Sequence, residues 1–379
     1  MRQPYLLIIL LMLMFYSRIA GATPFFARTY HFSCQTCHNG YPRLNDFGQA
    51  FKANGFRIPG AEKTAPLAWK KTVPLAVQVL PTQERFSPGQ GHAEFTDTQL
   101  LAGGLLTPRT SFYLHHSLWI DDKPVEFPSY EVWVEQVLDE RTKTMVKVGQ
   151  FELPYNHSPG THQITVFGPL LYGAGLQGND VRPGAPMRGV QFRGMISDRV
   201  RWYLAVGAPS VLSTGNTAGK REFLGEFRDV YIRASSRNFS RNIGGFLYLT
   251  SPTRDPSDPS SHNDGQRYGL EGTYLWKEIQ FDGMAVYGEN SNPLGNKGKG
   301  VLRGMFVEAS KMIRPWVGVT GRWEAQTASV GGVNTYTDAK TLGLRFYPLK
   351  DRNLLRLNAE YQQGDHGRSA TAIQASVSF

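Results

Sequence analysis

The chain has 379 residues, with 41 Lys and Arg against 31 Asp and Glu side chains and a formal net charge of +10 at pH 7. The excess is moderate and contains no Lys/Arg blocks, which excludes a typical nucleic-acid binder. The mean hydropathy is -0.34, yet 17 Tyr, 22 Phe, 7 Trp and 40 Gly are many for a soluble domain.

The first 22 residues predict a secretory signal peptide. Arg2 precedes an apolar run from Tyr5 to Tyr16, and Ala20-Gly21-Ala22 has the small-x-small form that signal peptidase accepts. The run is too short to cross a bilayer as a stable helix, although a retained anchor is the alternative. Removing residues 1–22 takes away two arginines and no acid, so the mature chain stays moderately basic.

The segment HFSCQTCHNG contains the only two cysteines of the chain, Cys34 and Cys37, with His38 directly after them. Two thiols at i and i+3 on one helical turn can both reach the vinyl groups on one edge of a haem. The following histidine then directs its imidazole at the iron. This pattern predicts one covalent haem c with His38 as the proximal iron ligand. Export supports it, because bacteria attach haem c outside the cytoplasm.

Three other uses of the two thiols are open at this point. A redox Cys-x-x-Cys pair would be expected near a βαβ unit, which the sequence does not show. A zinc site needs four ligands, and no second Cys/His pair lies nearby. A disulfide across two intervening residues would constrain almost no chain. Haem attachment fits the sequence better than any of the three.

Residues 23–60 predict a small helical c-type haem domain around this motif, followed by a linker over residues 61–71. Asn45 or Asp46 can cap a helix, and Gly55 suits a left-handed C′ position. So few residues cannot build a hydrophobic core alone, so we expect the haem to supply it. The apolar face of the helix is formed by Leu44, Phe47 and Phe51.

No distal iron ligand is evident, because residues 39–60 contain neither Met nor His. His31 is the nearest candidate in the sequence, but it would have to fold back tightly to reach the opposite face of the haem. An open or water-ligated iron would shift the chemistry toward small molecules. The other candidates lie farther along the chain at His115, His157, His162 and Met187.

From residue 72 the pattern of apolar residues changes from helical to alternating. In LLRLNAEYQ, Leu355, Leu357, Ala359 and Tyr361 fall on one face and polar residues fall on the other. RYGLEGTYLW and WVGVTGRWE alternate in the same way. No later apolar run is long enough to cross a membrane as a helix, so a closed β-barrel is the remaining way through lipid.

Residues 72–379 predict a mainly β protein, a roughly sixteen-stranded antiparallel transmembrane barrel. Short connections such as TPRT, DERT and MIRP alternate with long ones such as SPTRDPSDPSSHNDGQ and ASVGGVNTYTDA. A soluble β-sandwich, the alternative, has no reason for this alternation. The predicted strands are 72–86, 94–106, 110–121, 131–140, 142–153, 187–196, 198–211, 224–235, 240–253, 265–276, 278–290, 299–312, 314–327, 334–347, 353–363 and 370–379.

The connections also predict the location of the protein. Barrels of the bacterial outer membrane contact its lipid, have short periplasmic turns and long external loops, and keep both termini periplasmic when the strand number is even. The last segment, AIQASVSF, resembles the closing strand of such barrels. The connection over residues 153–186 is too long for an ordinary loop. By analogy with porins we predict that it folds inward, with a solvated surface loop as the alternative.

A single haem can connect the two sides of the membrane only from inside the lumen. The apolar band of such a barrel is about 25 Å tall, far thicker than one porphyrin. We therefore predict that residues 23–60 plug the barrel from the periplasmic side. Four arginines are predicted to face the lumen, where they could balance haem propionates or favour anions. They are Arg303, Arg322, Arg345 and Arg356.

The segment PFFARTYHFSCQTCHNGYPRLNDFGQAFKANGF, followed by a barrel that ends in Phe, resembles the fused outer-membrane cytochrome-porins of iron-oxidising bacteria. The motif is specific, whereas the barrel is similar to that family only in length and pattern. The shared features are Phe26-Ala27-Arg28, Ser33, Cys34, Cys37, His38, Pro42, Leu44-Asn45, Phe47-Gly48, Phe51-Lys52 and Gly55-Phe56.

The resemblance implies a monohaem domain seated in or against a porin. It would move electrons from an extracellular donor, Fe(II) in the best-known members, to a periplasmic c-type cytochrome or other carrier. The protein would then be an Fe(II):cytochrome c oxidoreductase or a plain electron carrier. Two alternatives are a diffusion porin whose haem domain is only a plug or sensor, and outward electron flow to an extracellular acceptor.

Overall fold

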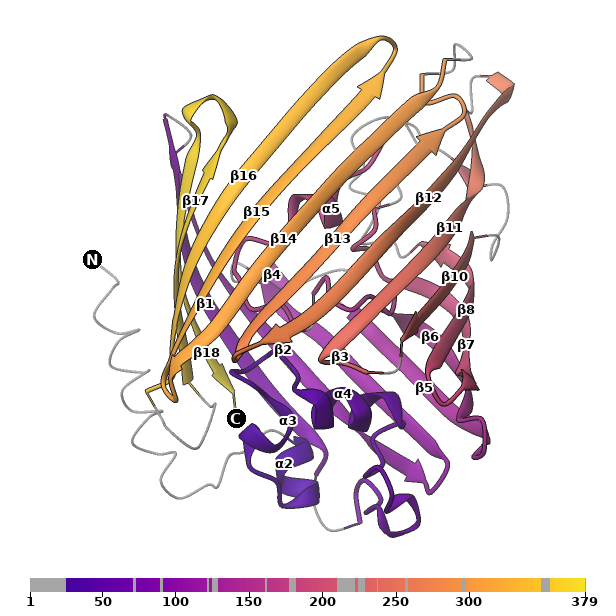
Figure 1. The fold of residues 1–379 in the computed structure, drawn as a ribbon, viewed down its shortest axis with the longest axis vertical. Coiled ribbons are helices and arrows are strands. Elements are labelled where there is room, and N and C mark those ends of the chain that lie inside the picture. The colour runs from indigo at the N-terminus through magenta and orange to yellow at the C-terminus, as the bar shows by residue number, and fades with distance from the viewer. Residues whose placement is uncertain are drawn as a thin grey trace.

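Sixteen strands of eight or more residues close into one antiparallel barrel within the described part of the chain (Figure 1). The first strand pairs with the last, with Gln78 opposite Ser378 and Ser87 opposite Ser369. The predicted signal peptide lies outside the described residues. In this computed structural model those residues are 25–70, 73–88, 91–120, 123–124, 129–160, 162–176, 182–209, 222–223, 229–236, 238–255, 258–294, 298–348 and 355–378.

The long strands match the predicted segments to within a few residues at most ends. Two short pieces, β4 (Lys123–Pro124) and β9 (Glu222–Phe223), pair with β3 and β11. The long strands are β1 (Leu75–Ser87), β2 (His92–Thr107), β3 (Thr110–Ile120), β5 (Ser129–Asp139), β6 (Thr144–Phe151), β7 (Met187–Ser197), β8 (Val200–Pro209), β10 (Asp229–Ser236), β11 (Arg241–Asp255), β12 (Asp258–Trp276), β13 (Ile279–Asn290), β14 (Gly300–Arg314), β15 (Val317–Val330), β16 (Val333–Phe346), β17 (Leu355–Gly364) and β18 (Ser369–Ser378).

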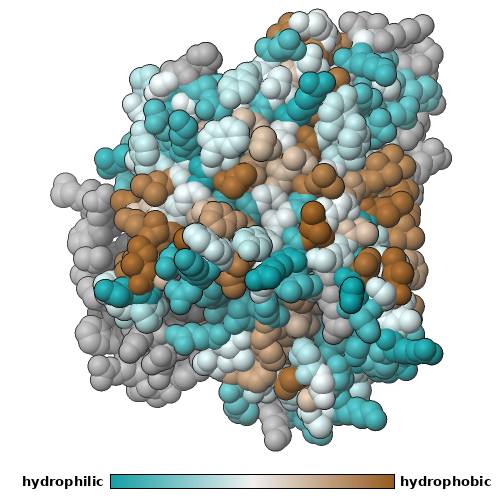
Figure 2. Space-filling model, viewed as in Figure 1, coloured by the Kyte–Doolittle hydropathy of each residue, from teal (hydrophilic) through white to brown (hydrophobic). Residues whose placement is uncertain are grey.

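The strands alternate between apolar side chains outside and polar side chains inside, as predicted. On β17, Leu357 and Tyr361 are exposed on the outer face, whereas Arg356, Asn358 and Glu360 are buried in the lumen. Hydrophobic residues gather across the middle of the visible face, with hydrophilic ones above and below (Figure 2). An apolar outer band over a polar interior is what a barrel in lipid requires.

Two connections that the sequence predicts as long loops are largely strand. β11 continues to Asp255 and β12 begins at Asp258, and the pair Gly331–Gly332 turns β15 directly into β16. Both glycines have positive φ, 59° and 81°, which suits a tight hairpin turn. The prediction is wrong here because strand ends that extend beyond the lipid band need no apolar face. Apolar and polar residues therefore do not alternate there, and the sequence pattern does not identify these ends as strand.

The N-terminal module, residues 25–70, lies at the end of the barrel where the connections 107–110, 139–144 and 276–279 are short (Figure 1). We call this end the short-turn rim. β1 begins and β18 ends at the same rim. No helix among the described residues is long and apolar enough to span a membrane. The module contains α2 (Phe25–Tyr30), α3 (Cys34–Cys37), α4 (Asp46–Ala53) and a 3₁₀ turn at Glu62–Thr64.

Arg43 fixes the module to the inside of the barrel. Its side chain is buried, and its Nη2 lies 2.8 Å from the carboxylates of both Asp282 on β13 and Glu308 on β14. Nη1 donates to Ser310. Since an ion buried in a low-dielectric interior needs an opposite charge nearby, this cluster holds the module in place.

The rim supplies further contacts. Arg57 pairs with Glu140 in the turn between β5 and β6, at 2.6 Å. The ring of Phe56 stacks on Trp133 of β5, with ring centroids 5.6 Å apart. Asp46 accepts a hydrogen bond from Ser240 in the turn between β10 and β11. The module therefore enters the barrel mouth, as the sequence predicts, and contacts several sides of the wall.

The described residues of the connection 153–186, which we call the inner loop, fold into the lumen as predicted. It contains α5 (Leu170–Gly173), which packs against β14 and β15 on the far side of the barrel. The backbone N–H of Phe167 donates to Glu360 at 3.0 Å, and its carbonyl accepts from Arg322 at 2.7 Å. The inner loop therefore crosses the lumen above the module.

Replacing Arg43 by Met should release the module from the barrel. Two buried carboxylates would lose their cation. Removing one partner of a buried ion pair costs about 3–5 kcal/mol of stability. We expect trypsin to cut the folded, detergent-solubilised variant at Lys52 and Arg57 at least about 100-fold faster than the wild type. Arg303→Met, on the outer face, is the matched control. Equal cleavage of Arg43→Met and wild type would contradict the docking.

Candidate cofactor site

The two cysteines lie on one turn of helix at the barrel mouth. α3 contains Cys34 and Cys37, which form no disulfide, and His38 caps its C-terminal end with an N–H that donates to the Cys34 carbonyl at 3.0 Å. Residues at i and i+3 of a helical turn share a face. Burial, and then the nearby Cys34, raise the pKa of the Cys37 thiol to about 11. Both sulfurs are therefore placed to bond to one edge of a flat group.

The imidazole of His38 is oriented by the backbone that follows it. Its Nδ1 lies 3.1 Å from the carbonyl of Pro42 and 3.3 Å from that of Arg43. Carbonyls only accept, so Nδ1 carries the hydrogen and Nε2 keeps its lone pair. Burial lowers the pKa of His38 to about 4, although the two carbonyls act to raise it. A neutral imidazole with this backbone hydrogen bond has the arrangement that metal-ligating histidines show.

Tight packing of α4 against α3 holds the motif. Asn45, one of the two predicted caps, accepts from the N–H of Gly48 at 2.9 Å and donates to the carbonyls of Gln35 and Thr36 at 3.1 Å. A Cβ at Gly48 would lie 2.2 Å from the Cys37 carbonyl oxygen. Gly55 follows α4 with a φ of +65°, as predicted for its C′ position.

The apolar core of the module is aromatic and continues into the barrel wall. The predicted face residues Phe47 and Phe51 are stacked with centroids 6.2 Å apart, and Phe51 is 4% exposed. Phe56 extends the cluster to Tyr113 of β3 and Trp133 of β5. The barrel wall therefore contributes to the core of the module, which the sequence did not predict. The other members of the cluster are Phe26, Tyr30 and Phe32.

The candidate distal ligands lie in different surroundings. His31 has a φ of +56° and an exposed side chain at the end of α2. His157 Nε2 lies 3.4 Å from Glu308, and His115 Nε2 lies 2.9 Å from Gln99, so both are engaged with barrel residues. Met187 is 1% exposed and packed in the lumen core.

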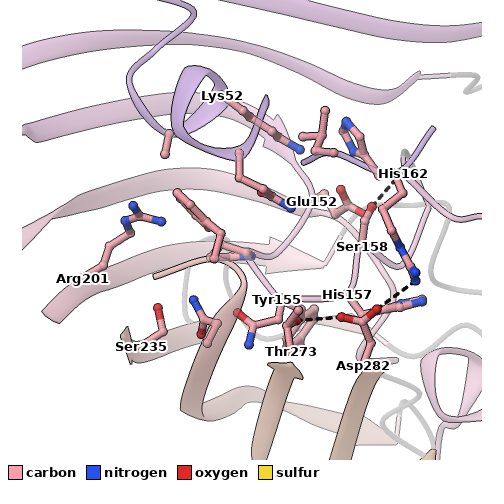
Figure 3. A pocket seen from close by; sticks show the side chains of 18 of the residues that line it. Lys52, Glu152, Tyr155, His157, Ser158, His162, Arg201, Ser235, Thr273 and Asp282 are labelled. Atoms are coloured by element: carbon pink, nitrogen blue, oxygen red, sulfur yellow. Dashed lines mark hydrogen bonds and ion pairs between the residues drawn. The ribbon is translucent and has the colours of Figure 1, made fainter. Parts of the chain in front are cut away.

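His162 lines a cavity of about 470 Å³ between α4, the inner loop and the barrel wall (Figure 3). Its backbone N–H donates to Ser158 Oγ at 3.0 Å, and Ser158 is held by the carboxylate of Glu152. Burial first, and then the nearby Lys52 and His38, push the pKa of His162 well below its usual value. Asn39 and Arg43, which follow His38 in the chain, line the same cavity, so His162 is a distal candidate that faces the module.

The four arginines that the sequence places in the lumen divide into three kinds. Arg303 is exposed on the outer face, in phase with Met305, and lies over the ring of Tyr287, so its prediction is wrong. Arg322 faces inward and is paired with Glu308 and Glu324. Arg345 and Arg356 also face inward and are 3% and 6% exposed.

Sequence reasoning did not find the residues that position the motif from a distance. Asp282 and Glu308 bind Arg43, and Tyr347 donates from its hydroxyl to the carbonyl of Tyr41 at 2.7 Å. The sequence indicated only that the polar residues of each strand alternate onto its inward face, and not which partner each of them binds. In the described residues, no group of three or more His, Cys, Asp and Glu side chains is arranged to hold a metal ion directly.

Comparison with solved structures shows the fold of a porin. The chain is similar to an anion-selective porin from Comamonas acidovorans, with a TM-score of 0.61 and 11% identity over 80% of this chain and 98% of that one. It is also similar to a loop-deletion mutant of OmpT, an outer membrane protein of Vibrio cholerae, at 0.58 and 11%, over 80% and 98%. The outer membrane channel DcaP of Acinetobacter baumannii matches at 0.56 and 10%, over 80% and 96%.

No protein-family model and no curated protein matches the chain. At these identities the solved structures establish a porin-like barrel fold. The cysteine motif, its cofactor and the periplasmic position of the termini are not tested by them.

Gly48→Ala should loosen the motif. The added methyl would overlap the Cys37 carbonyl, so α4 must move away from α3, at a cost of about 1–3 kcal/mol. We expect buried Cys34 in haem-free protein to be alkylated by iodoacetamide at least about tenfold faster than in the wild type. Gly321→Ala, where a Cβ meets nothing within 4 Å, is the control. Unchanged alkylation would show that this close approach does not hold the motif.

Proposed function

We propose that this protein transfers electrons through a haem c that Cys34, Cys37 and His38 hold in the mouth of its porin-like barrel. The hydrogen bond from His38 Nδ1 to the Pro42 carbonyl is the observation that carries the proposal. It leaves Nε2 as the only ring atom able to bind a metal, directly after two thiols on the same turn. When bound, haem c supplies a reversible one-electron iron couple.

The surrounding residues have separate roles in this proposal. The thiols of Cys34 and Cys37 would form the two thioether links, and the Pro42 and Arg43 carbonyls would keep the His38 ring in one orientation. The aromatic cluster around Phe51 would exclude water, which influences the reduction potential of an iron centre. The barrel wall would isolate the group from lipid.

The donor and the direction of flow come from the family resemblance. We propose an extracellular donor, Fe(II) in the first instance, and a periplasmic c-type cytochrome or other carrier as the acceptor. The position of the module at the short-turn rim supports a partner on that side, because short turns are periplasmic in outer-membrane barrels. Flow in the opposite direction would use the same residues.

The second candidate is a diffusion porin whose haem-bearing module is a plug or sensor. The comparisons support this candidate better than electron transfer, since the matched structures include an anion-selective porin and an outer membrane channel. The lumen of this chain is crossed by the inner loop and entered by the module, which favours a restricted pore.

Reconstitution with a maturation system for haem c separates the two candidates. We expect the purified mature protein to carry haem that survives denaturing electrophoresis, and the Cys34→Ala, Cys37→Ala variant to carry none. In liposomes, Fe(II) added outside should reduce the haem in stopped-flow absorbance traces. Haem that no external donor or acceptor can reach, together with conductance of small anions in planar bilayers, would favour the porin. A colourless wild-type protein would end the haem proposal.

His162 is the distal ligand that we expect in the loaded protein. His162→Ala should convert a low-spin ferric signal to a high-spin one in low-temperature electron paramagnetic resonance. His162→Met should produce the near-infrared charge-transfer band of a methionine ligand. His31→Ala is the control, because that side chain is exposed. A spectrum that changes in His31→Ala and not in His162→Ala would assign the role to His31 instead.

A further inference from the structure

Two arginines on neighbouring strands are buried in the lumen with part of each guanidinium unbonded. Arg345 lies on β16 and Arg356 on β17, and both are more than nine-tenths buried. For each of them, Nε and Nη1 have no hydrogen-bond partner among the described residues. The one bond of Arg356 joins Nη2 to Gln374 at 3.3 Å.

Buried polar groups in proteins are almost always bonded, and a buried charge is almost always paired. An unbonded buried group of this kind indicates a missing water, ion or ligand. Two guanidinium groups on adjacent strands present planar donors that suit the two oxygens of a carboxylate or phosphate. An oxoanion is therefore the class of ligand that these donors fit.

The acids nearest to these arginines already have other partners. Glu308 is bound by Arg43 and Arg322. Glu360, on the same face of β17 as Arg356, accepts the backbone N–H groups of Val166 and Phe167 in the inner loop. The positive charge of Arg345 and Arg356 is therefore not balanced by a direct ion pair within the described lumen.

The pair also lies beside the cysteine motif. The ring of Tyr41 is 5.1 Å from the ring of His38, and the guanidinium carbon of Arg356 is 5.7 Å from the same Tyr41 ring. Tyr347, directly after the end of β16 and two residues after Arg345, donates from its hydroxyl to the Tyr41 carbonyl. Tyr41 therefore lies between the proposed iron ligand and the arginines.

We propose that Arg345 and Arg356 form a buried oxoanion site beside His38 that takes a carboxylate. One source of the carboxylate is a propionate of the haem, and this source rests on the function proposed above. The other source is a small free anion in the lumen, which does not depend on haem. The other two arginines of the predicted set do not belong to this site, because Arg322 is paired with Glu308 and Arg303 lies on the outer face.

The double variant Arg345→Gln, Arg356→Gln tests the site in two arms. In the haem-loaded protein, a redox titration should show a lower midpoint potential than in the wild type, because the removed cations favour the electron-rich reduced state. In protein made without haem maturation, acetate and inorganic phosphate at constant ionic strength should raise the thermal unfolding temperature of the wild type and not of the variant. Heat-modifiable migration on a gel confirms that each variant forms a barrel.

Two further variants keep the test specific. Arg345→Lys, Arg356→Lys retains the charge and should restore most of the wild-type potential or anion response. Arg303→Gln removes a cation from the outer face and should change neither. An anion response that the haem-free wild type shows and the haem-loaded wild type lacks identifies the propionate as the source, and a response of both forms identifies a free anion.

The proposal is overturned if the double glutamine variant has the wild-type potential and the haem-free wild type does not respond to acetate or phosphate. A wild-type protein that carries no haem would instead contradict the proposed function. In that case the anion response of the haem-free protein would still decide whether the arginines form a site.

Discussion

A charge that is buried in the lumen of this barrel must meet an opposite charge, and that requirement holds the inside of the molecule together. Arg43 of the N-terminal module is placed between Asp282 and Glu308, and Glu308 is shared with Arg322. Each of these groups would be costly alone in a low-dielectric interior. The module and the wall therefore depend on one another for their charge balance.

The same principle explains the difference between the two faces of each strand. The outer face contacts lipid and needs only apolar surface, so one apolar residue can replace another there. The inner face must satisfy each polar atom with a particular partner. Arg193, for example, binds Glu135 of β5 with two of its nitrogens and the carbonyl of Ala53 with the third. The specific contacts of the fold are therefore made by the side chains that face the lumen.

This division also determined what the sequence could predict. Strand positions and faces follow from the period of two, and Leu357 and Arg356 fall on the predicted sides. The ends of β11, β12, β15 and β16 were missed, because strands beyond the lipid band lose that period. Arg303 was misplaced for the same reason: near a strand end an outward residue can be charged.

The cysteine motif is local, so Cys34, Cys37, His38 and the cap at Asn45 could be recognised from their spacing. Their partners are not local. Glu308 lies 265 residues from Arg43 in the chain, and no pattern in a single sequence connects the two. The same difficulty applies to His162, because proximity in the chain pointed to His31, and only the fold places His162 in the cavity beside α4.

The burial of Cys34 in a module that enters a closed barrel has a consequence for the order of biosynthesis. The module precedes β1 in the chain, and the wall is complete only when β1 pairs with β18, the last strand to be made. Any enzyme that joins a bulky group to this sulfur has to reach it while the polypeptide is still in transit. Modification would then come before assembly in the membrane, and an unmodified chain could not be repaired afterwards without being unfolded.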